Sequence, residues 1–424
     1  MDLNAQTPEE LAEIWDQDHV TNKFPSDVRH KDLQVYLDGL RKLGVRVDEV
    51  GRSNANREIY QIEFGRGKTK VFLWSQMHGD EPTATSALID IFTYLQKNRD
   101  KDWVTKIESE LTIRAVPMLN PDGAELFQRR NLQSIDINRD AAVLQTPEGK
   151  LLKKLRDEWS PEIGFNLHNQ GSLTTVGRSG QQAAISLLVV FGDAAKTKTE
   201  GLERNRRIAG AMTDTLRKFI PNNIGRYDDG YNGRAFGDNF SAWGTPVILI
   251  ETGALHGKDE MFLVKMNFAA LVTAMKVLSD GSADTYDPAS YDALRSNGSG
   301  SLYSALFRGA NIVRRNGLQK VFIADIAINL ERRRASFAAP AYIREVGDLG
   351  SASGLDEYDA SGFYVVPRFG LLAVSELGEL LFYKKDRSID WRSKELEKSF
   401  PPDAVFSGGK WSRGEAVVPR RSKL

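Results

Sequence analysis

Two histidines and one glutamate stand where they could bind a single cation. His78 lies three residues before Glu81 and shortly after the apolar run Val71–Trp74, and His168 directly follows a second apolar run, Ile163–Leu167. Imidazole nitrogens and carboxylate oxygens bind Zn²⁺ at about 2.0 to 2.2 Å, and three protein ligands leave one coordination position open. These residues therefore predict a zinc site of the catalytic type, with one Zn²⁺ per chain.

Further polar residues follow the predicted strands and offer the other groups that such a site needs. The turn Asn120-Pro121-Asp122-Gly123 leads to Asp136, which could accept the free ring N–H of a ligand histidine. Asn138 and Arg139 present planar donors that suit a terminal carboxylate. Glu251 ends another apolar run, and a lone carboxylate facing an electrophilic metal can act as a general base.

The elements that must position these residues alternate between strand and helix. Short apolar runs predict buried strands at 71–74, 111–118, 163–167, 185–191 and 247–250. Helical periodicity over 84–95, and the Thr146-Pro147 pair that opens 147–159, predict helices between them. This order predicts an α/β fold with a mixed, largely parallel sheet sandwiched by helices, in which sites form at the carboxyl ends of strands.

Changes of composition divide the chain into four parts. We expect an N-terminal helical segment that packs on the catalytic domain, the catalytic domain itself, a linker rich in Ser, Asp, Gly and Asn, and a β-rich accessory domain, at residues 1–45, 46–280, 281–301 and 302–424. The accessory domain is expected to contain short strands at 321–328, 362–366, 371–374 and 380–383. No chemical constellation appears in it, so packing or binding is its expected role.

Composition excludes several classes of function. The chain has 424 residues, of which 41% are hydrophobic and 27% are charged, with 57 basic and 57 acidic side chains. This balance argues against a nucleic-acid partner. No cysteine is present, which excludes disulfides, thiolate zinc sites and cysteine nucleophiles.

The sequence also bears on location. No run of 18 apolar residues predicts a membrane span, and the N-terminus lacks the profile of a signal peptide. We expect a soluble protein, periplasmic or extracellular if a leader has been removed and cytoplasmic otherwise. The final Ser422-Lys423-Leu424 matches a peroxisomal address, a three-residue pattern that chance readily produces.

Taken in order, these motifs resemble the carboxypeptidase A type of zinc metallocarboxypeptidase. The resemblance spans roughly residues 50 to 275 and includes the H-x-x-E pair, the Asn-Pro-Asp-Gly turn, Arg129, the Asp-x-Asn-Arg run, His168 and Glu251. It implies a zinc-carboxypeptidase-like fold and a peptide substrate with a free C-terminus.

The resemblance also implies a role for each matching residue. His78, Glu81 and His168 would bind zinc, and Arg129 would polarise the scissile carbonyl. Asn138 and Arg139 would hold the C-terminal carboxylate, and Glu251 would move the proton from water to the leaving amine. A lid tyrosine is also expected before Glu251, where Tyr227 and Tyr231 are both candidates and spacing favours Tyr231.

Some positions depart from the family pattern or stay ambiguous. Ser134 stands where a glycine is common, Arg130 could take the role of its neighbour Arg129, and Asn169 and Gln170 follow His168 in place of the usual small residue. The pocket for the C-terminal side chain is expected within 231–245. Asp238 in that segment could favour basic side chains or could be a structural hydrogen-bond partner.

Two other functions remain open at this point. The first is a zinc amidase of the same superfamily that acts on bacterial cell-wall peptides or N-acyl amino acids. The second is an inactive binding module, which should lack a metal ligand or the catalytic glutamate, and neither is missing. The oligomeric state is not indicated by the sequence.

Overall fold

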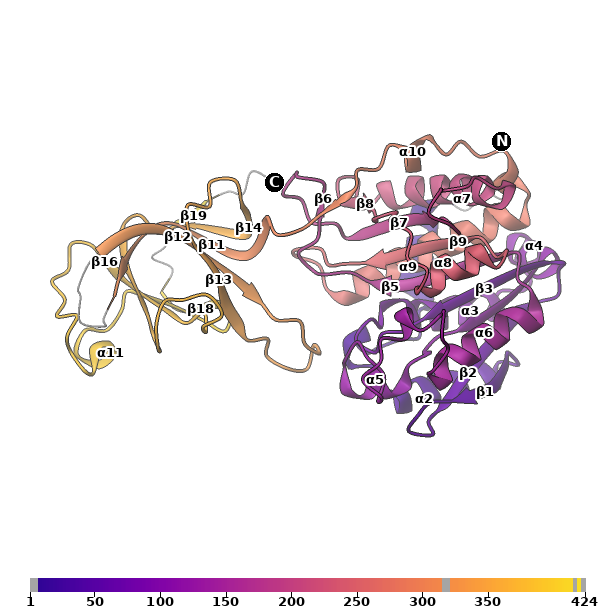
Figure 1. Cartoon of the computed structure of the whole chain (residues 1–424), viewed down its shortest axis with the longest axis horizontal. Helices are drawn as coiled ribbons and strands as arrows, with labels where there is room; N and C mark the ends of the chain where they lie inside the picture. Colours follow the sequence, from indigo (N-terminus) through magenta and orange to yellow (C-terminus); the bar gives the residue numbers. More distant parts are fainter. Residues whose placement is uncertain (1–6, 315–320, 415–417, 421–424) are drawn as a thin grey trace. The chain divides into compact units, whose positions relative to one another are not determined.

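The structure is a computed structural model that describes residues 7–314, 321–414 and 418–420. It divides into two compact units (Figure 1). Unit 1 comprises the chain up to Ser172 together with Ala183–Asn297, and unit 2 comprises Leu173–Gln182 and the chain from Gly298 onward. The peroxisome-like Ser422-Lys423-Leu424 lies outside the described residues.

The centre of unit 1 is an eight-stranded mixed sheet with strand order β1-β2-β4-β3-β5-β9-β7-β8. Its strands are β1 Arg46–Arg52, β2 Glu58–Gly65, β3 Thr69–Ser75, β4 Leu111–Val116, β5 Ile163–Asn169, β7 Ile185–Val190, β8 Ile224–Arg226 and β9 Val247–Thr252. The pairs β3–β4, β3–β5, β5–β9 and β7–β8 are parallel, and the other three pairs are antiparallel.

Helices cover both faces of this sheet. They are α1 Pro8–Asp18, α2 His30–Lys42, α3 Thr83–Lys97, α4 Asp102–Glu110, α5 Pro121–Leu126, α6 Pro147–Trp159, α7 Glu200–Arg217, α8 Phe236–Ala242, α9 Glu260–Ser279 and α10 Ala289–Asp292, with 3-10 turns at Pro25–Asp27, Ile137–Arg139 and Ser282–Asp284. Side chains alternate along β3: Val71 and Leu73 pack in the core with α3, α7 and α9, and Phe72 and Trp74 in a second core with α6 and α8. The predicted α/β sandwich is confirmed.

One described helix, α9, is long and apolar enough to cross a membrane by length and composition, with a mean hydropathy of 1.6. In unit 1, 67% of that stretch is buried, and the helix packs against α3 and α7. The high apolar content is therefore explained by the core that it fills.

The five predicted strands of this sheet are present, as are both predicted helices. Strands β1 and β2, in contrast, were not predicted. Strand β1 lies at the sheet edge and reads Arg-Val-Asp-Glu-Val-Gly-Arg, and β2 alternates apolar with polar residues. Edge and half-buried strands carry polar side chains by necessity, so a search for continuous apolar runs misses them.

The N-terminal helices are tied to the sheet by a buried carboxylate on α3. Asp90 accepts hydrogen bonds from Trp15 Nε1 at 3.0 Å, from the backbone N–H groups of Val20 and Thr21 at 2.9 and 3.0 Å, and from Thr21 Oγ1 at 2.8 Å. Burial raises the pKa of Asp90 although these donors oppose the shift. Four donors to one side chain fix the chain between α1 and α2 against the core.

The structure differs from the expected linker over residues 281–297. This stretch carries a 3-10 turn and α10 and belongs to unit 1. Tyr291 is buried and its Oη accepts the backbone N–H of Val189 at 2.8 Å, and Arg226 donates its backbone N–H to Arg295 O at 2.8 Å. The small polar composition suggested flexibility, but one buried tyrosine and backbone pairing hold the segment on the sheet edge.

Unit 2 is built around a nine-stranded sheet. Its strands are β11 Leu302–Val313, β12 Val321–Leu330, β13 Ala341–Gly347, β14 Ser353–Asp359, β15 Phe363–Pro367, β16 Leu380–Lys384, β17 Ala404–Ser407, β18 Lys410–Arg413 and β19 Val418–Arg420, with one short helix, α11 Leu396–Ser399. A β-rich C-terminal part is thus confirmed. The short strands β6 Thr175–Val176 and β10 Asn297–Gly298 form a separate pair. The strand predicted at 371–374 is wrong, because this segment is a loop whose Leu371 and Val374 are 54% and 55% exposed.

Candidate active site and metal centre

The sheet brings the predicted chemical residues to one edge. Strands β3 and β5 are parallel neighbours with Ser75 beside Leu167, so the chain segments that follow them emerge together. Strands β5 and β9 are also parallel, and His168 lies directly beside Glu251 in their register. Residues paired in this way on adjacent strands point to the same side of a sheet, with strands about 4.8 Å apart.

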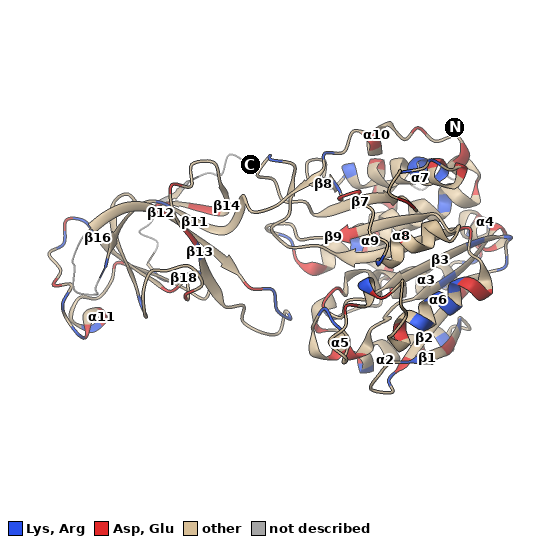
Figure 2. Cartoon of the chain, in the orientation of Figure 1, with Lys and Arg blue, Asp and Glu red and all other residues tan. Residues whose placement is uncertain are grey.

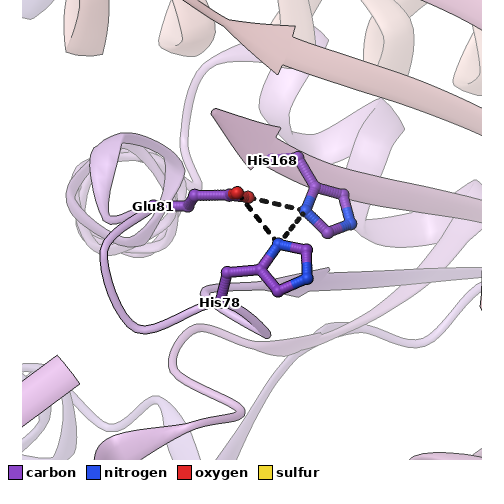
Figure 3. A group of neighbouring side chains, drawn as sticks. All are labelled: His78, Glu81 and His168. Carbon is purple, nitrogen blue, oxygen red and sulfur yellow. Dashed lines mark hydrogen bonds and ion pairs between the residues drawn. The ribbon is translucent and has the colours of Figure 1, made fainter. Parts of the chain in front are cut away.

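His78, Glu81 and His168 converge on one point (Figure 3). Glu81 Oε1 lies 2.9 Å from His78 Nδ1, and Glu81 Oε2 lies 2.7 Å from His168 Nδ1. The two Nδ1 atoms are 3.2 Å apart, and all three side chains are buried. Two ring nitrogens and a carboxylate aimed at each other in this way form a preformed ligand set for a cation.

Asp136 and Arg129 surround this triad. Asp136 Oδ1 lies 3.0 Å from His78 Nε2, which leaves His78 Nδ1 as the nitrogen whose lone pair faces Glu81 and His168. Arg129 Nε donates to Asp136 Oδ2 at 3.0 Å, and Arg129 Nη1 lies 3.2 Å from Glu81 Oε1. Arg130 instead donates to Ser134 O at 3.1 Å, so the structure brings Arg129 rather than Arg130 to the triad.

The pKa values of the triad reflect its buried charges. Burial disfavours the charged Glu81, but His78 and His168 hold the pKa of this carboxyl well below its usual range. Burial lowers the pKa of His78, yet the charge of Glu81 and the hydrogen bond to Asp136 outweigh it and raise that pKa to about 9. For His168, burial prevails and lowers the pKa. The carboxylate form of Glu81, the form that binds metals, is thus favoured.

Glu251 lies in an apolar and negatively charged setting. It is only 7% exposed, and burial, followed by the nearby charge of Glu81, raises its pKa well above the usual range. The hydroxyl of Tyr227 hydrogen-bonds to Glu251, and the charge of Glu251 followed by burial raises the pKa of Tyr227 to about 12. A carboxylate with a raised pKa beside a ligand set is typical of an acid–base catalyst.

The two candidate tyrosines are placed differently. Tyr227 follows β8, packs against the core beneath α8 and contacts Glu251. Tyr231 is 39% exposed, and among the described residues no hydrogen bond joins it to the site. The structure therefore brings Tyr227, and not Tyr231, to the candidate centre, although chain spacing favoured Tyr231.

Asn138 and Arg139 lie on the 3-10 turn Ile137–Arg139, which Asp136 caps by accepting the N–H of Asn138. Asn138 Oδ1 accepts the N–H of Phe236 at 2.9 Å, so its amide Nδ2 faces away from that bond. Arg139 donates to Asn138 O at 2.6 Å, and no ion pair to it occurs in the described part of the chain. The charge of Arg139 acts on both Tyr227 and Asp238, which places its guanidinium near both side chains.

Comparison with known proteins finds similarity to one family of enzymes. Residues 36–220 match the sequence profile of the zinc carboxypeptidase family. Over this segment, the chain is similar to zinc carboxypeptidases.

Individual relatives cover shorter stretches. Carboxypeptidase 2 of Trichophyton rubrum is 31% identical over 101 residues, which are 24% of this chain and 18% of the relative. Carboxypeptidase D of Mus musculus is 27% identical over 157 residues, covering 32% of this chain and 11% of the relative. A metallo-carboxypeptidase structure from Burkholderia cenocepacia is 16% identical with a TM-score of 0.49, covering 59% of this chain and 69% of that one. The chain spans about a fifth of the length of the first curated relatives it matches.

The triad fits the metal of a zinc carboxypeptidase. Its donor set is two imidazole nitrogens and one carboxylate, and the ligand atoms lie within 4.8 Å of one another. Without a cation, the buried carboxylate of Glu81 depends on the imidazole rings and on Arg129 for its hydrogen bonds. Cysteine is absent from the chain, so His and carboxylate are the ligands that such a site can use.

Two turns hold His78 and Arg129 in place. Asn120 caps α5 by accepting the N–H of Gly123 at 2.8 Å, and its Nδ2 lies 3.2 Å from Met77 O and 3.5 Å from Arg129 O. Gly79 approaches the same turn so closely that an added Cβ would lie 1.9 Å from the carbonyl carbon of Gly123. The residue after His78 must therefore be glycine.

The loop between Arg129 and Asp136 is fixed from within. Asn131 is fully buried, its Oδ1 accepts the N–H groups of Gln133 and Ile135, and its Nδ2 donates to Glu148 Oε2 at 3.1 Å. Ser134, at the position where the family commonly has glycine, adopts a left-handed φ of 60°. A non-glycine residue there costs about 1 to 2 kcal/mol, which the hydrogen bonds of Asn131 help to offset.

One supporting residue was not assigned a role from the sequence. The backbone N–H of Asn169 donates to Glu81 Oε2 at 3.1 Å, and its side chain exchanges hydrogen bonds with Thr83 at 2.7 and 3.3 Å. In the sequence, Asn169 stands directly after His168 in place of the usual small residue. That departure was the only sign in the sequence that Asn169 supports the site. Asn169 joins the end of β5 to the start of α3 and so orients Glu81 toward His168.

Zinc binding provides the first test of this site. We expect the protein to bind one Zn²⁺ per chain, and His168→Ala to weaken binding roughly 100-fold or more because one of three ligands is lost. Zinc titration in a chelator-buffered solution measures the affinity, and the zinc-dependent rise in Tm reports the same binding. His256→Ala, which changes an exposed histidine, is the matched control. Equal zinc affinity in the His168 variant and the wild type would contradict the assignment.

Proposed function

We propose that the protein is a zinc-dependent carboxypeptidase that hydrolyses the C-terminal peptide bond of peptides. The observation that carries this proposal is the buried triad of His78, Glu81 and His168 with Glu251 beside it in register on the neighbouring strand. The family match ends at residue 220 and so does not include Glu251. The role of Glu251 is supported by its position beside His168 on the neighbouring strand and by its burial near Glu81 and Tyr227.

Substrate binding is assigned to the Asn–Arg pair. The terminal carboxylate of a peptide would accept hydrogen bonds from Arg139 and from the amide of Asn138, which have donors to spare. Anchoring the last residue there would present its peptide bond to the triad. A free carboxylate is thus the feature that distinguishes the last peptide bond from internal ones.

Bond cleavage requires an activated water and a place for the developing negative charge. Zinc bound by the triad would supply a Lewis acid that lowers the pKa of water toward 7. Glu251 takes a proton from the attacking water and delivers it to the amine that leaves as the C–N bond breaks. Arg129 stabilises the oxyanion that forms on the carbonyl oxygen, a contribution of about 3 kcal/mol in comparable sites.

Two features around Glu251 support its role as base. Its burial excludes bulk water, so that proton exchange is directed to the bound substrate. The hydroxyl of Tyr227, which hydrogen-bonds to Glu251, can hold the carboxylate in one orientation and can close over a bound peptide. We therefore assign the substrate-closing role to Tyr227 in place of Tyr231.

Removing the base should abolish turnover without loss of the metal. Glu251→Gln keeps the size of the side chain but cannot accept the proton, so kcat/KM should fall about 10³-fold while one zinc per chain is retained. Release of single C-terminal residues from a peptide library, followed by mass spectrometry, measures the activity. Glu158→Gln changes a glutamate with a 62% exposed side chain and should behave as wild type. Substantial activity in the Glu251 variant would overturn the assignment.

Anchoring by Arg139 predicts dependence on the substrate carboxylate. Arg139→Ala should raise KM and lower kcat/KM roughly 30- to 100-fold for peptides with a free C-terminus, because a charge-assisted hydrogen bond is lost. The same peptides with a C-terminal amide should be poor substrates of both enzymes and show no further loss. Arg130→Ala, at an exposed arginine that donates to Ser134 O, is the control. An equal loss on free and amidated peptides would argue against anchoring.

The two tyrosines can be distinguished by deleting one hydroxyl at a time. Tyr227→Phe should lower kcat/KM about tenfold because Glu251 loses a hydrogen bond and the substrate loses a closing contact. Tyr231→Phe should leave the kinetics unchanged because its side chain is exposed. Steady-state kinetics on one dipeptide substrate gives both values. The reverse pattern would return the role to Tyr231.

A further inference from the structure

Unit 2 contains a cavity of about 460 Å³ that the proposed peptidase chemistry does not use. Its lining includes the end of β11 at Val313 and Arg314, the end of β15 at Pro367 and Arg368, and the pair Trp391 and Arg392. A cavity of this volume is in the range that holds a small ligand or a few side chains of a peptide.

The sheet register explains why two of the arginines meet. Strands β11 and β15 are parallel, with Ile312 beside Val365. Arg314 follows the last residue of β11 and Arg368 follows the last residue of β15, so both leave the sheet at the same edge. Parallel strands present their carboxyl ends together, as the strands around the triad do in unit 1.

The cavity has a rigid aromatic wall. Trp391 packs edge-on against Tyr364 and Tyr383, with ring centroids 5.4 and 5.5 Å apart. These rings belong to a small core that also contains Val313 and Leu381. Burial of this core holds the backbone that carries Arg392 in a fixed position, and the N–H of Arg392 donates to Asp390 Oδ1 at 3.0 Å.

The three arginines differ in their partners. Arg368 forms two hydrogen bonds of 3.0 Å to the carboxylate of Glu397 on α11. Arg314 stacks on Phe322 at 5.3 Å, and neither Arg314 nor Arg392 has an ion-pair partner in the described parts of the chain. Among the residues that the structure describes, no acidic side chain lines the cavity. Basic and acidic residues are otherwise interspersed over both units (Figure 2), so this cavity is a local excess of positive charge.

Apolar side chains adjoin the positive charge. In the loop between β15 and β16, Phe369, Leu371, Val374 and Leu377 are 61%, 54%, 55% and 44% exposed. This is the segment in which a short strand was expected at 371–374. Leu371 lines the cavity, and the other three lie in the same loop. Exposed apolar side chains beside a charged cavity are typical of a binding surface.

We propose that this cavity binds an acidic peptide segment in which carboxylates flank an apolar side chain. The two unpaired guanidiniums would donate bidentate hydrogen bonds to the carboxylates. Leu371 and the Trp391 wall would cover the apolar side chain. An acidic glycan or a nucleic acid offers charge without an aliphatic side chain, so the apolar border favours a peptide. The proposal does not depend on the proposed peptidase activity.

Fluorescence anisotropy with the full-length, zinc-loaded protein tests it. The probe is a fluorescein-labelled Asp-Glu-Leu-Glu-Asp peptide with a C-terminal amide, which lacks the free carboxylate that the active site would anchor. We expect saturable binding that weakens with added salt, and an affinity at least about tenfold lower for the double variant Arg314→Glu and Arg392→Glu. Replacing the probe's leucine with serine, or Leu371 with Asp, should lower affinity several-fold.

The matched control carries the same change of charge elsewhere in unit 2. Arg344 and Lys410 are exposed and lie outside the cavity, so Arg344→Glu with Lys410→Glu should bind the probe as wild type does. An equal loss in the control variant would mean general charge attraction and would overturn the proposal. So would unchanged binding by the cavity variant, or tighter binding of a polygalacturonate or single-stranded DNA of equal charge. Tm measurements confirm that each variant is folded, and Glu251→Gln should bind the probe unchanged, which separates this test from that of the peptidase.

Discussion

The arrangement of unit 1 depends on holding three electron-rich atoms together where water cannot separate them. The carboxylate of Glu81 lies within 2.9 Å of His78 Nδ1 and 2.7 Å of His168 Nδ1. In a buried setting such a group is favourable only if positive charge compensates it. Three features hold these atoms together: the parallel strands, the glycine at position 79, and the hydrogen bond from the backbone of Asn169 to Glu81.

Arg129 supplies part of that positive charge. Its Nη1 lies 3.1 Å from His78 Nδ1 and 3.2 Å from Glu81 Oε1. A cation bound to His78 Nδ1 takes the same lone pair, so that contact to Arg129 cannot persist at the same time. The pair of Arg129 Nε with Asp136 can persist, because it uses a different atom. Metal binding would therefore leave Arg129 anchored through Nε, with the contact of Nη1 to His78 broken and its contact to Glu81 still available.

Most of the catalytic centre could be predicted from the sequence because its residues follow continuous apolar strands. His168 and Glu251 each lie at the end of a continuous apolar segment, which is the pattern of a buried parallel strand. The capped helix at 147–159 was also predicted with its observed bounds. The choice between Tyr227 and Tyr231 could not be made, because both lie in one loop and only the path of the chain after β8 turns Tyr227 inward. The linker expected at 281–301 shows a related difficulty, since its composition gives little sign that Tyr291 would anchor it.

Unit 2 illustrates what pattern alone leaves undecided. The run 371–374 has the apolar composition of a strand, but the register of β15 with β11 places it after Arg368, where the chain must turn away from the sheet. The arginines at the two sites differ in their partners. Arg129 is held between two carboxylates and serves a site whose net charge is balanced, whereas Arg314 and Arg392 have no carboxylate to pair with in the described chain. An unpaired guanidinium gains most when a ligand brings a carboxylate to it. The proposed site for acidic groups in unit 2 therefore lies at the two arginines that the fold leaves without a carboxylate partner.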